Sequence, residues 1–287
     1  MPFHCENPDF LVHSVPDDNT FPVNRNAMER SEIFRDMFAL CAPCSDASPG
    51  AEENLDLHEK AGILEVLLQL LHNPPPPPVA ISFDEKFTTR LPKVRFESHT
   101  VIPLPLLSTM FELADKYVID SPLVESLKVH LEAHAPAHPL QVYSFATLHD
   151  MDRIASEASQ YVTPMASYRL DEVKVIPSVQ AYHKIVRLQD FRVRALRELL
   201  LAEEIFPHGY GECTSHRDKT VASWDRQRKA LAGRIETGTD VAGEMDALRD
   251  GLRDCETCYK ACTAAVEMLA YKCRKVARRL HQLPEGY

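Results

Sequence analysis

Helical periodicity dominates the second half of the chain and constrains its fold more than any other feature. From residues 121–122 onward, apolar residues recur three and four positions apart, which is the spacing of one helix face. Later prolines separate these segments, because proline cannot continue a helix. Ser178 is expected to cap a long helix that ends near Phe206. A turn is predicted at 237–240, after which a final helix is expected over 241–281.

The first third of the chain instead mixes short extended runs with short helical runs. Its turn-forming residues fall between runs rich in β-branched and aromatic side chains, which favours strands. In chain order we expect a hairpin of two strands over 9–14 and 20–25, and then a helix pair over 26–40. A third strand over 55–57, an apolar helix over 63–71 and a strong helix over 106–117 should follow. The sequence therefore predicts an α+β N-terminal domain followed by an all-α C-terminal region.

Charge divides the chain in the same way. Residues 1–135 carry 21 acidic and 10 basic side chains, whereas residues 136–287 carry 21 and 22. We expect a domain over 1–132 with a proline-rich insertion at about 73–103, a helical region over 133–207, and a helical hairpin over 208–287. The acidic first half disfavours contact with a phosphate backbone, so we do not expect nucleic acid as a partner.

Several function classes lack their sequence patterns. The chain has nine glycines and no phosphate-binding loop, nucleophile elbow or HExxH pattern, so we expect no enzyme activity. The sequence contains no run of 18 apolar residues, so no membrane span is predicted. The first residues lack both a basic segment and an apolar core, so we expect an intracellular protein, cytoplasmic or nuclear.

Two Cys/His pairs lie in the last 75 residues. Cys213 and His216 are separated by two residues, and so are Cys255 and Cys258. Zinc prefers four tetrahedral nitrogen and sulfur ligands, and this spacing lets two side chains converge on one ion. A helical hairpin between the pairs would bring them together. The sequence therefore predicts a structural zinc site formed by these four residues.

Other interpretations of these cysteines remain open. If residues 255–258 lie within a helix, Cys262 continues the same face and is a rival ligand. The same cysteines also suit a helix core as buried free thiols. Disulfides are disfavoured in a reducing compartment, and His208 is a further candidate ligand.

The first 132 residues carry two motifs in the order found in a known family. "Phe-Arg-Asp-Met-Phe" occupies 34–38 and "Ala-Asp-Lys-Tyr" occupies 114–117. Together with the predicted strand and helix order, they make residues 7–132 resemble the BTB/POZ domain, particularly its divergent fungal branch. Asn24 stands where the family usually has a histidine, and residues 73–103 look like an insertion.

This resemblance implies a protein–protein interaction module. It implies a protein partner or self-association, often as a homodimer, and in some members a role as substrate adaptor for cullin-type ubiquitin ligases. Edge strands and amphipathic helices are surfaces that a second copy can cover.

Two further patterns suggest alternatives. A basic stretch over 272–279 follows the predicted zinc hairpin, which would suit a zinc-stabilised, transcription-related or DNA-binding regulator. Apolar residues interleave with it at helical spacing, which instead indicates an amphipathic helix with a solvated basic face. The five prolines at 74–78 suit either a rigid spacer or a ligand for domains that bind polyproline.

Overall fold

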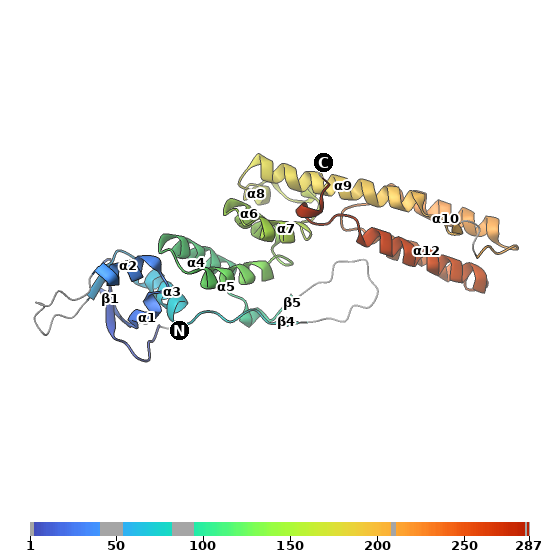
Figure 1. Ribbon diagram of the computed structural model, residues 1–287. Helices are drawn as coiled ribbons and strands as arrows, with labels where there is room; N and C mark the ends of the chain where they lie inside the picture. The colour runs from blue at the N-terminus through green and yellow to red at the C-terminus, as the bar shows by residue number, and fades with distance from the viewer. Residues whose placement is uncertain (1–2, 41–53, 82–94, 208–210, 285, 287) are drawn as a thin grey trace, which may run out of the picture. The chain divides into compact units, whose positions relative to one another are not determined.

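The chain folds into two compact units. A computed structural model describes residues 3–40, 54–81, 95–207, 211–284 and 286. The first unit comprises Met1–Ile81 and Arg95–His134, and the second includes Ala135–Tyr287. Most of the described chain is helical, and a small sheet lies near the N-terminus (Figure 1). The expected order, an N-terminal part that contains a sheet followed by a helical C-terminal part, is therefore confirmed.

A three-stranded sheet of order β2-β1-β3 forms one part of the first unit. β1 (Phe10–Ser14) and β2 (Asn19–Val23) form the expected antiparallel hairpin, and β3 (Asn54–Leu57) pairs with β1 in parallel. The turn of the hairpin places Asp18 at a φ of 50°, a conformation that aspartate tolerates better than most residues. Val12 and Ser14 are buried, as the two-residue period of a strand dictates.

Five helices complete this core, close to the predicted positions. They are α1 (Arg25–Met28), α2 (Glu32–Leu40), α3 (Ala61–His72), α4 (Leu104–Lys116) and α5 (Ser121–Ala133). α3 buries five leucines. Asn24 and Asp120 accept backbone N–H groups at the N-termini of α1 and α5, which satisfies donors that have no partner within the helix.

The polyproline run is packed against α5. Ser126 Oγ donates to the carbonyl of Pro75 at 3.0 Å, and His130 Nε2 donates to that of Pro76 at 3.0 Å. β4 (Ala80–Ile81) and β5 (Arg95–Phe96) then form a small antiparallel hairpin, followed by η1 (Ser98–Thr100). Residues 82–94 of the expected insertion lie outside the described residues.

The second unit is helical in every described element. Its elements are α6 (Pro139–Leu148), α7 (Asp152–Ser159), η2 (Met165–Ser167), α8 (Leu170–Val173), α9 (Val179–Ala202), α10 (Arg217–Ala232), α11 (Val241–Asp246), η4 (Ala247–Leu252), α12 (Glu256–Arg274) and η5 (Leu280–Gln282). Ser178 caps α9 as predicted, through its Oγ and the N–H of Ala181. None of the described helices is both long and apolar enough to cross a membrane.

The expected single helix over 241–281 is wrong. The chain there forms α11, η4 and α12, with a break before α12 at Cys255. Helix geometry explains the arrangement. The 16 residues of α10 span about 24 Å, and the six residues of α11 with the six of η4 return about 21 Å. The short return brings the chain back to the start of α10, where α12 begins.

A shared apolar core holds α9 to α12 together. Trp224 is 1% exposed, and its indole N–H donates to the carbonyl of Glu203 at 2.9 Å. The core residues from these elements and their connections are Leu196, Leu200, Ile205, Phe206, Trp224, Leu231, Ala232, Ile235, Val241, Ala242, Met245, Cys262, Ala265, Val266, Leu269, Cys273 and Val276. The indole pairs its only polar group inside this core, so it is buried without an unsatisfied donor.

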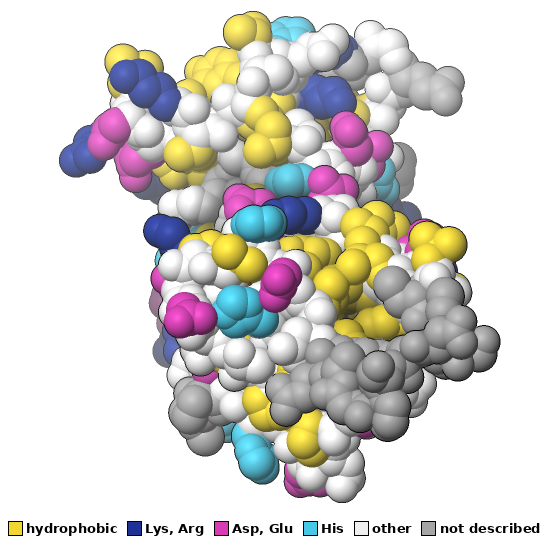
Figure 2. All heavy atoms as spheres, turned by 90° about the vertical axis from the view of Figure 1, so that its left-hand side faces the viewer, with side chains coloured by type: hydrophobic (Ala, Val, Ile, Leu, Met, Phe, Trp, Pro, Cys, Tyr) yellow, Lys and Arg dark blue, Asp and Glu magenta, His cyan; other side chains and the backbone are white. Residues whose placement is uncertain are grey.

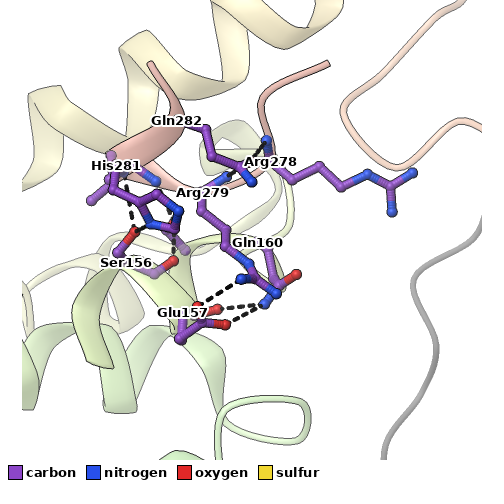
Figure 3. Close-up of polar contacts among 9 residues, drawn as sticks. Ser156, Glu157, Gln160, Arg278, Arg279, His281 and Gln282 are labelled. Atoms are coloured by element: carbon purple, nitrogen blue, oxygen red, sulfur yellow. Dashed lines mark hydrogen bonds and ion pairs between the residues drawn. The ribbon is translucent and has the colours of Figure 1, made fainter. Parts of the chain in front are cut away.

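Polar contacts attach the C-terminal segment to α7 (Figure 3). Arg279 forms an ion pair of 2.8 Å with Glu157. His281 donates its backbone N–H to Ser156 Oγ at 3.1 Å, and its ring Nδ1 lies 2.7 Å from the same oxygen. These contacts join the end of the chain to an element more than 120 residues earlier.

Candidate metal centre

Cys213 and His216 lie in the turn that leads into α10. The carbonyl of Cys213 accepts the N–H of Arg217 at 2.9 Å, and that of His216 accepts the N–H of Thr220 at 2.9 Å. His216 occupies the N-cap position of α10. Gly211 precedes the pair at a φ of 72°, in the region that favours glycine. The turn therefore places both side chains at the N-terminal end of α10.

Cys255 and Cys258 lie at the start of α12. Cys255 is the N-cap residue, and its carbonyl accepts the N–H of Tyr259 at 2.9 Å. The expectation that Cys255 lies inside a helix is therefore corrected, because the helix begins one residue later. The backbone N–H of Cys258 faces the Cys255 sulfur and is the main reason that the pKa of the Cys255 thiol is lowered.

The two pairs converge, as the sequence predicted. The four ligand atoms all lie within 4.8 Å of one another. Cys213 Sγ is 3.4 Å from His216 Nδ1 and 3.6 Å from Cys255 Sγ. Tetrahedral zinc with ordinary bond lengths would separate such atoms by about 3.6 and 3.8 Å. The sulfurs are far outside the bonding distance of a disulfide, about 2.05 Å. The Cys₃His cluster could hold a metal ion.

The four side chains differ in their exposure. Cys258 is fully buried, Cys213 and Cys255 are half-buried, and His216 is exposed. Burial raises the pKa of the Cys258 thiol. Thr220, 2% exposed on the first turn of α10, donates its hydroxyl to Cys258 Sγ at 3.4 Å. Thr220 thus links α10 to a candidate ligand on α12.

The other candidate ligands do not join the cluster. Cys262 is fully buried in the core of the second unit, where burial raises the pKa of its thiol to about 11. Cys262 is therefore a buried thiol of the core and not a ligand. It lies one helical turn beyond Cys258, where its side chain packs against apolar neighbours. His208 lies outside the described residues. Within the described part of the chain, no second group of three or more such side chains converges in this way.

Thr220 was not anticipated from the sequence. It lies four positions after His216, so helical spacing could have placed it on the same face as the first ligand pair. Its partner, however, is 38 positions later in the chain. Only the fold brings that helix start beside α10.

The basic stretch over 272–279 makes several contacts within the unit. Lys272 pairs with the buried carboxylate of Glu203 at 2.5 Å. Arg279 pairs with Glu157, and the ammonium of Lys275 lies 4.2 Å from the centre of the Tyr271 ring. Cations already engaged in this way present a weaker surface to a phosphate backbone.

Comparison with known proteins gives no relative from which a function could be taken. No protein-family model matches the chain, and no curated protein matches it either. The fold and the site therefore describe a mostly helical protein with a small N-terminal sheet and a candidate Cys₃His metal centre.

Proposed function

We propose that the protein is a zinc-binding interaction protein, and that the cluster of Cys213, His216, Cys255 and Cys258 holds a structural zinc ion. The convergence of four ligand atoms from two helix starts carries this proposal. Three thiolates and one imidazole form a soft donor set that suits zinc better than magnesium or calcium. Four protein ligands would fill a tetrahedral shell, leaving no position for a substrate. The ion would therefore serve the fold.

The location of the cluster explains what the ion would do. His216 and Cys255 are the N-cap residues of α10 and α12, so a bound ion would join the N-terminal ends of these helices. Helix N-termini carry partial positive charge, which stabilises thiolates there. Because an unfolded chain does not hold the ligands together, the binding free energy would stabilise the fold of the second unit.

Elemental analysis of the purified full chain tests this proposal. We expect one zinc per chain, lost in Cys255→Ala and retained in Cys262→Ala. The second variant is the matched control, since it removes a cysteine of α12 that lies outside the cluster. Folded wild-type protein without metal, which also takes up no zinc during dialysis, would contradict the proposal.

We further propose that the first unit is a BTB/POZ-like interaction module. The order of its elements supports this: a hairpin, a helix pair, a third strand, an apolar helix and the helix that carries 114–116 of the second motif. The two motifs of the resemblance also meet. Phe34 stacks on Tyr117 with ring centroids 5.1 Å apart, and Ser31 Oγ donates to the carbonyl of Tyr117 at 2.6 Å.

Self-association is the form of binding that this unit favours. Leu40 is 87% exposed at the end of α2, and Val118 and Ile33 are also exposed. Figure 2 shows hydrophobic side chains of the first unit gathered on the face that it draws. In the described sheet, β2 and β3 pair only with β1, so each has an outer edge that a second copy could extend.

Light scattering during size-exclusion chromatography tests self-association. We expect a mass twice that of the 32.5 kDa chain. Leu40→Glu should return it to the monomer, since a charge in an apolar interface is costly to bury. Val179→Glu is a control on the second unit, where Val179 is 85% exposed. A strict monomer at every concentration would contradict the proposal.

A substrate-adaptor role for a cullin-type ubiquitin ligase is the narrower proposal within this one. It rests on the resemblance alone. Binding of the purified chain to immobilised cullin N-terminal domains would support it, and the absence of binding to all of them would remove it while leaving self-association intact. The DNA-binding alternative is less favoured, because Lys272 and Arg279 already pair with carboxylates.

A further inference from the structure

Two of the four candidate ligands, Cys213 and Cys255, form a partly exposed pair of thiols. Cys213 and Cys255 are both half-buried, and their sulfurs are 3.6 Å apart. They come from different segments, 42 positions apart in the sequence. Both residues are therefore partly exposed to water, and each sulfur has the other as a neighbour.

The third sulfur is protected. Cys258 is fully buried, and its sulfur accepts the hydroxyl of Thr220. Cys262 and Cys273 are also buried in the core of the second unit. Oxidation of cysteine follows thiolate character and exposure, so these thiols are poor targets for a peroxide in water.

We propose that Cys213 and Cys255 form a peroxide-oxidisable pair, at which a disulfide replaces the metal ion. The inference rests on the proposed zinc site and adds a modification to it. The reagent is hydrogen peroxide or an organic hydroperoxide. The product is zinc-free protein in which the N-terminal ends of α10 and α12 are joined covalently.

The chemistry balances in two steps. One thiolate attacks a peroxide oxygen, the O–O bond breaks, and a sulfenic acid forms as hydroxide or alkoxide leaves and takes up a proton. The second thiolate then attacks the sulfenic sulfur, the S–O bond breaks, and hydroxide leaves and is protonated to water. The two sulfurs lose two electrons in total, and the peroxide accepts them. With two thiolates gone, only His216 and Cys258 remain for zinc, and two ligands do not retain it.

The choice of pair decides the structural outcome. A link between Cys213 and Cys255 keeps α10 and α12 joined after the metal leaves. A link between Cys255 and Cys258 would instead close within the start of α12 and release α10. The 3.6 Å separation of the Cys213 and Cys255 sulfurs permits the first link, and the burial of Cys258 makes its thiol the poorer target for peroxide.

Zinc-loaded protein treated with hydrogen peroxide tests the proposal. Zinc release is followed with a chromophoric chelator, and disulfides are located by mass spectrometry of peptides. We expect zinc release to match formation of the Cys213–Cys255 link, with Cys262 and Cys273 still reduced. A thiol reductant followed by zinc should restore the starting protein. A Cys255–Cys258 link, or disulfides between chains, would overturn the assignment.

Hydrogen exchange over 213–220 tests the structural consequence. The oxidised, zinc-free protein should keep the slow exchange of the zinc form. Reduced protein stripped by a chelator should exchange faster by on the order of tenfold or more. Equal, fast exchange in both metal-free forms would contradict a covalent replacement of the ion.

The zinc content before peroxide separates the two proposals. Protein that never binds zinc would defeat the proposed zinc site, and this inference with it. Protein that binds zinc and keeps it in a peroxide excess that fully oxidises free glutathione would defeat this inference alone. Cys262→Ala is the matched variant, expected to bind zinc and release it as the wild type does.

Discussion

Thr220 donates its side-chain hydroxyl to the sulfur of Cys258 at 3.4 Å, and both residues are buried. This hydrogen bond joins the first turn of α10 to the first turn of α12. Groups that hydrogen-bond to a metal ligand fix its orientation and stabilise its charge, so Thr220 is placed to support the candidate centre from outside the ligand set.

Thr220→Val should therefore weaken zinc binding without removing it. The change keeps the shape of the side chain and removes the donor, and losses of this kind reduce metal affinity by about 10- to 100-fold. Competition with a chromophoric chelator measures the affinity. Thr263→Val is the control, since the Thr263 hydroxyl donates to the carbonyl of Tyr259 and not to a ligand. Equal affinity in both variants would show that the Thr220 contact is incidental.

Removal of the metal should destabilise the second unit, and the only tryptophan of the chain reports it. Trp224 lies eight positions after His216 on α10 and is 1% exposed. We expect a strong chelator to lower the urea midpoint of the Trp224 fluorescence transition, because zinc binds the folded ligand set far better than the unfolded one.

Cys255→Ala provides the control for that measurement. Without a full ligand set, the variant should unfold at the lower midpoint whether or not the chelator is present. A midpoint that responds to the chelator equally in the variant and the wild type would mean that the chelator acts elsewhere.

Local signals in the sequence were enough for much of the fold. Ser178 precedes a helix whose cap depends on nearby residues, and it acts as the cap that the sequence predicted. The two-residue spacing of the Cys/His pairs was enough to name the four residues that converge. The cap and the spacing within each Cys/His pair depend on residues within one helical turn, which a pattern can capture, whereas the meeting of the two pairs depends on the fold between them.

Features that depend on distant contacts were not predicted. The break before Cys255 follows from the need to return along α10, which no local pattern records. For Cys262 the sequence left a core thiol and a rival ligand both open, and the choice depends on how α12 packs in the second unit. The anchoring of the polyproline run depends on Ser126 and His130, more than 50 positions later. Tertiary packing decides all three, and the sequence shows it only indirectly.

Phe34→Ala should destabilise the first unit by about 3–5 kcal/mol, the usual cost of removing a buried phenylalanine. Phe34 is fully buried and stacks on Tyr117, so the cavity would lie between the two motifs. Hydrogen exchange over 31–38 and 113–119 should report the loss. The Trp224 transition should stay unchanged, because Trp224 belongs to the core of the second unit.

Val129→Ala is the control for this variant. Val129 is 42% exposed on α5, so its truncation should change stability by no more than about 0.5 kcal/mol. A similar loss in both variants would indicate that the stacked pair contributes no more than an ordinary surface residue.

His130 should make the first unit less stable as the pH falls below about 6.5, the usual pKa of histidine. It is 1% exposed, donates to the carbonyl of Pro76 and accepts the N–H of Ile102 at 3.3 Å. Burial lowers its pKa in the folded chain. The unfolded chain therefore takes up a proton first as the pH falls. The stabilisation is present above pH 6.5 and is lost towards the lower folded pKa.

His130→Asn isolates this effect, since asparagine does not titrate. The unfolding free energy of the variant should be about 1–3 kcal/mol below that of the wild type at pH 7, and the difference should be smaller at pH 5. Urea denaturation followed by circular dichroism measures it. The variant is compared with the wild type at each pH because His13 changes the pH dependence of stability in the opposite direction. Its hydrogen bonds to Asp56 and Asp18 raise its pKa. The exposed His99 is the control for the substitution itself, and His99→Asn should change the unfolding free energy at pH 7 by no more than about 0.5 kcal/mol. A His130→Asn deficit that is equal at both pH values would show that His130 stabilises the polyproline run by packing alone.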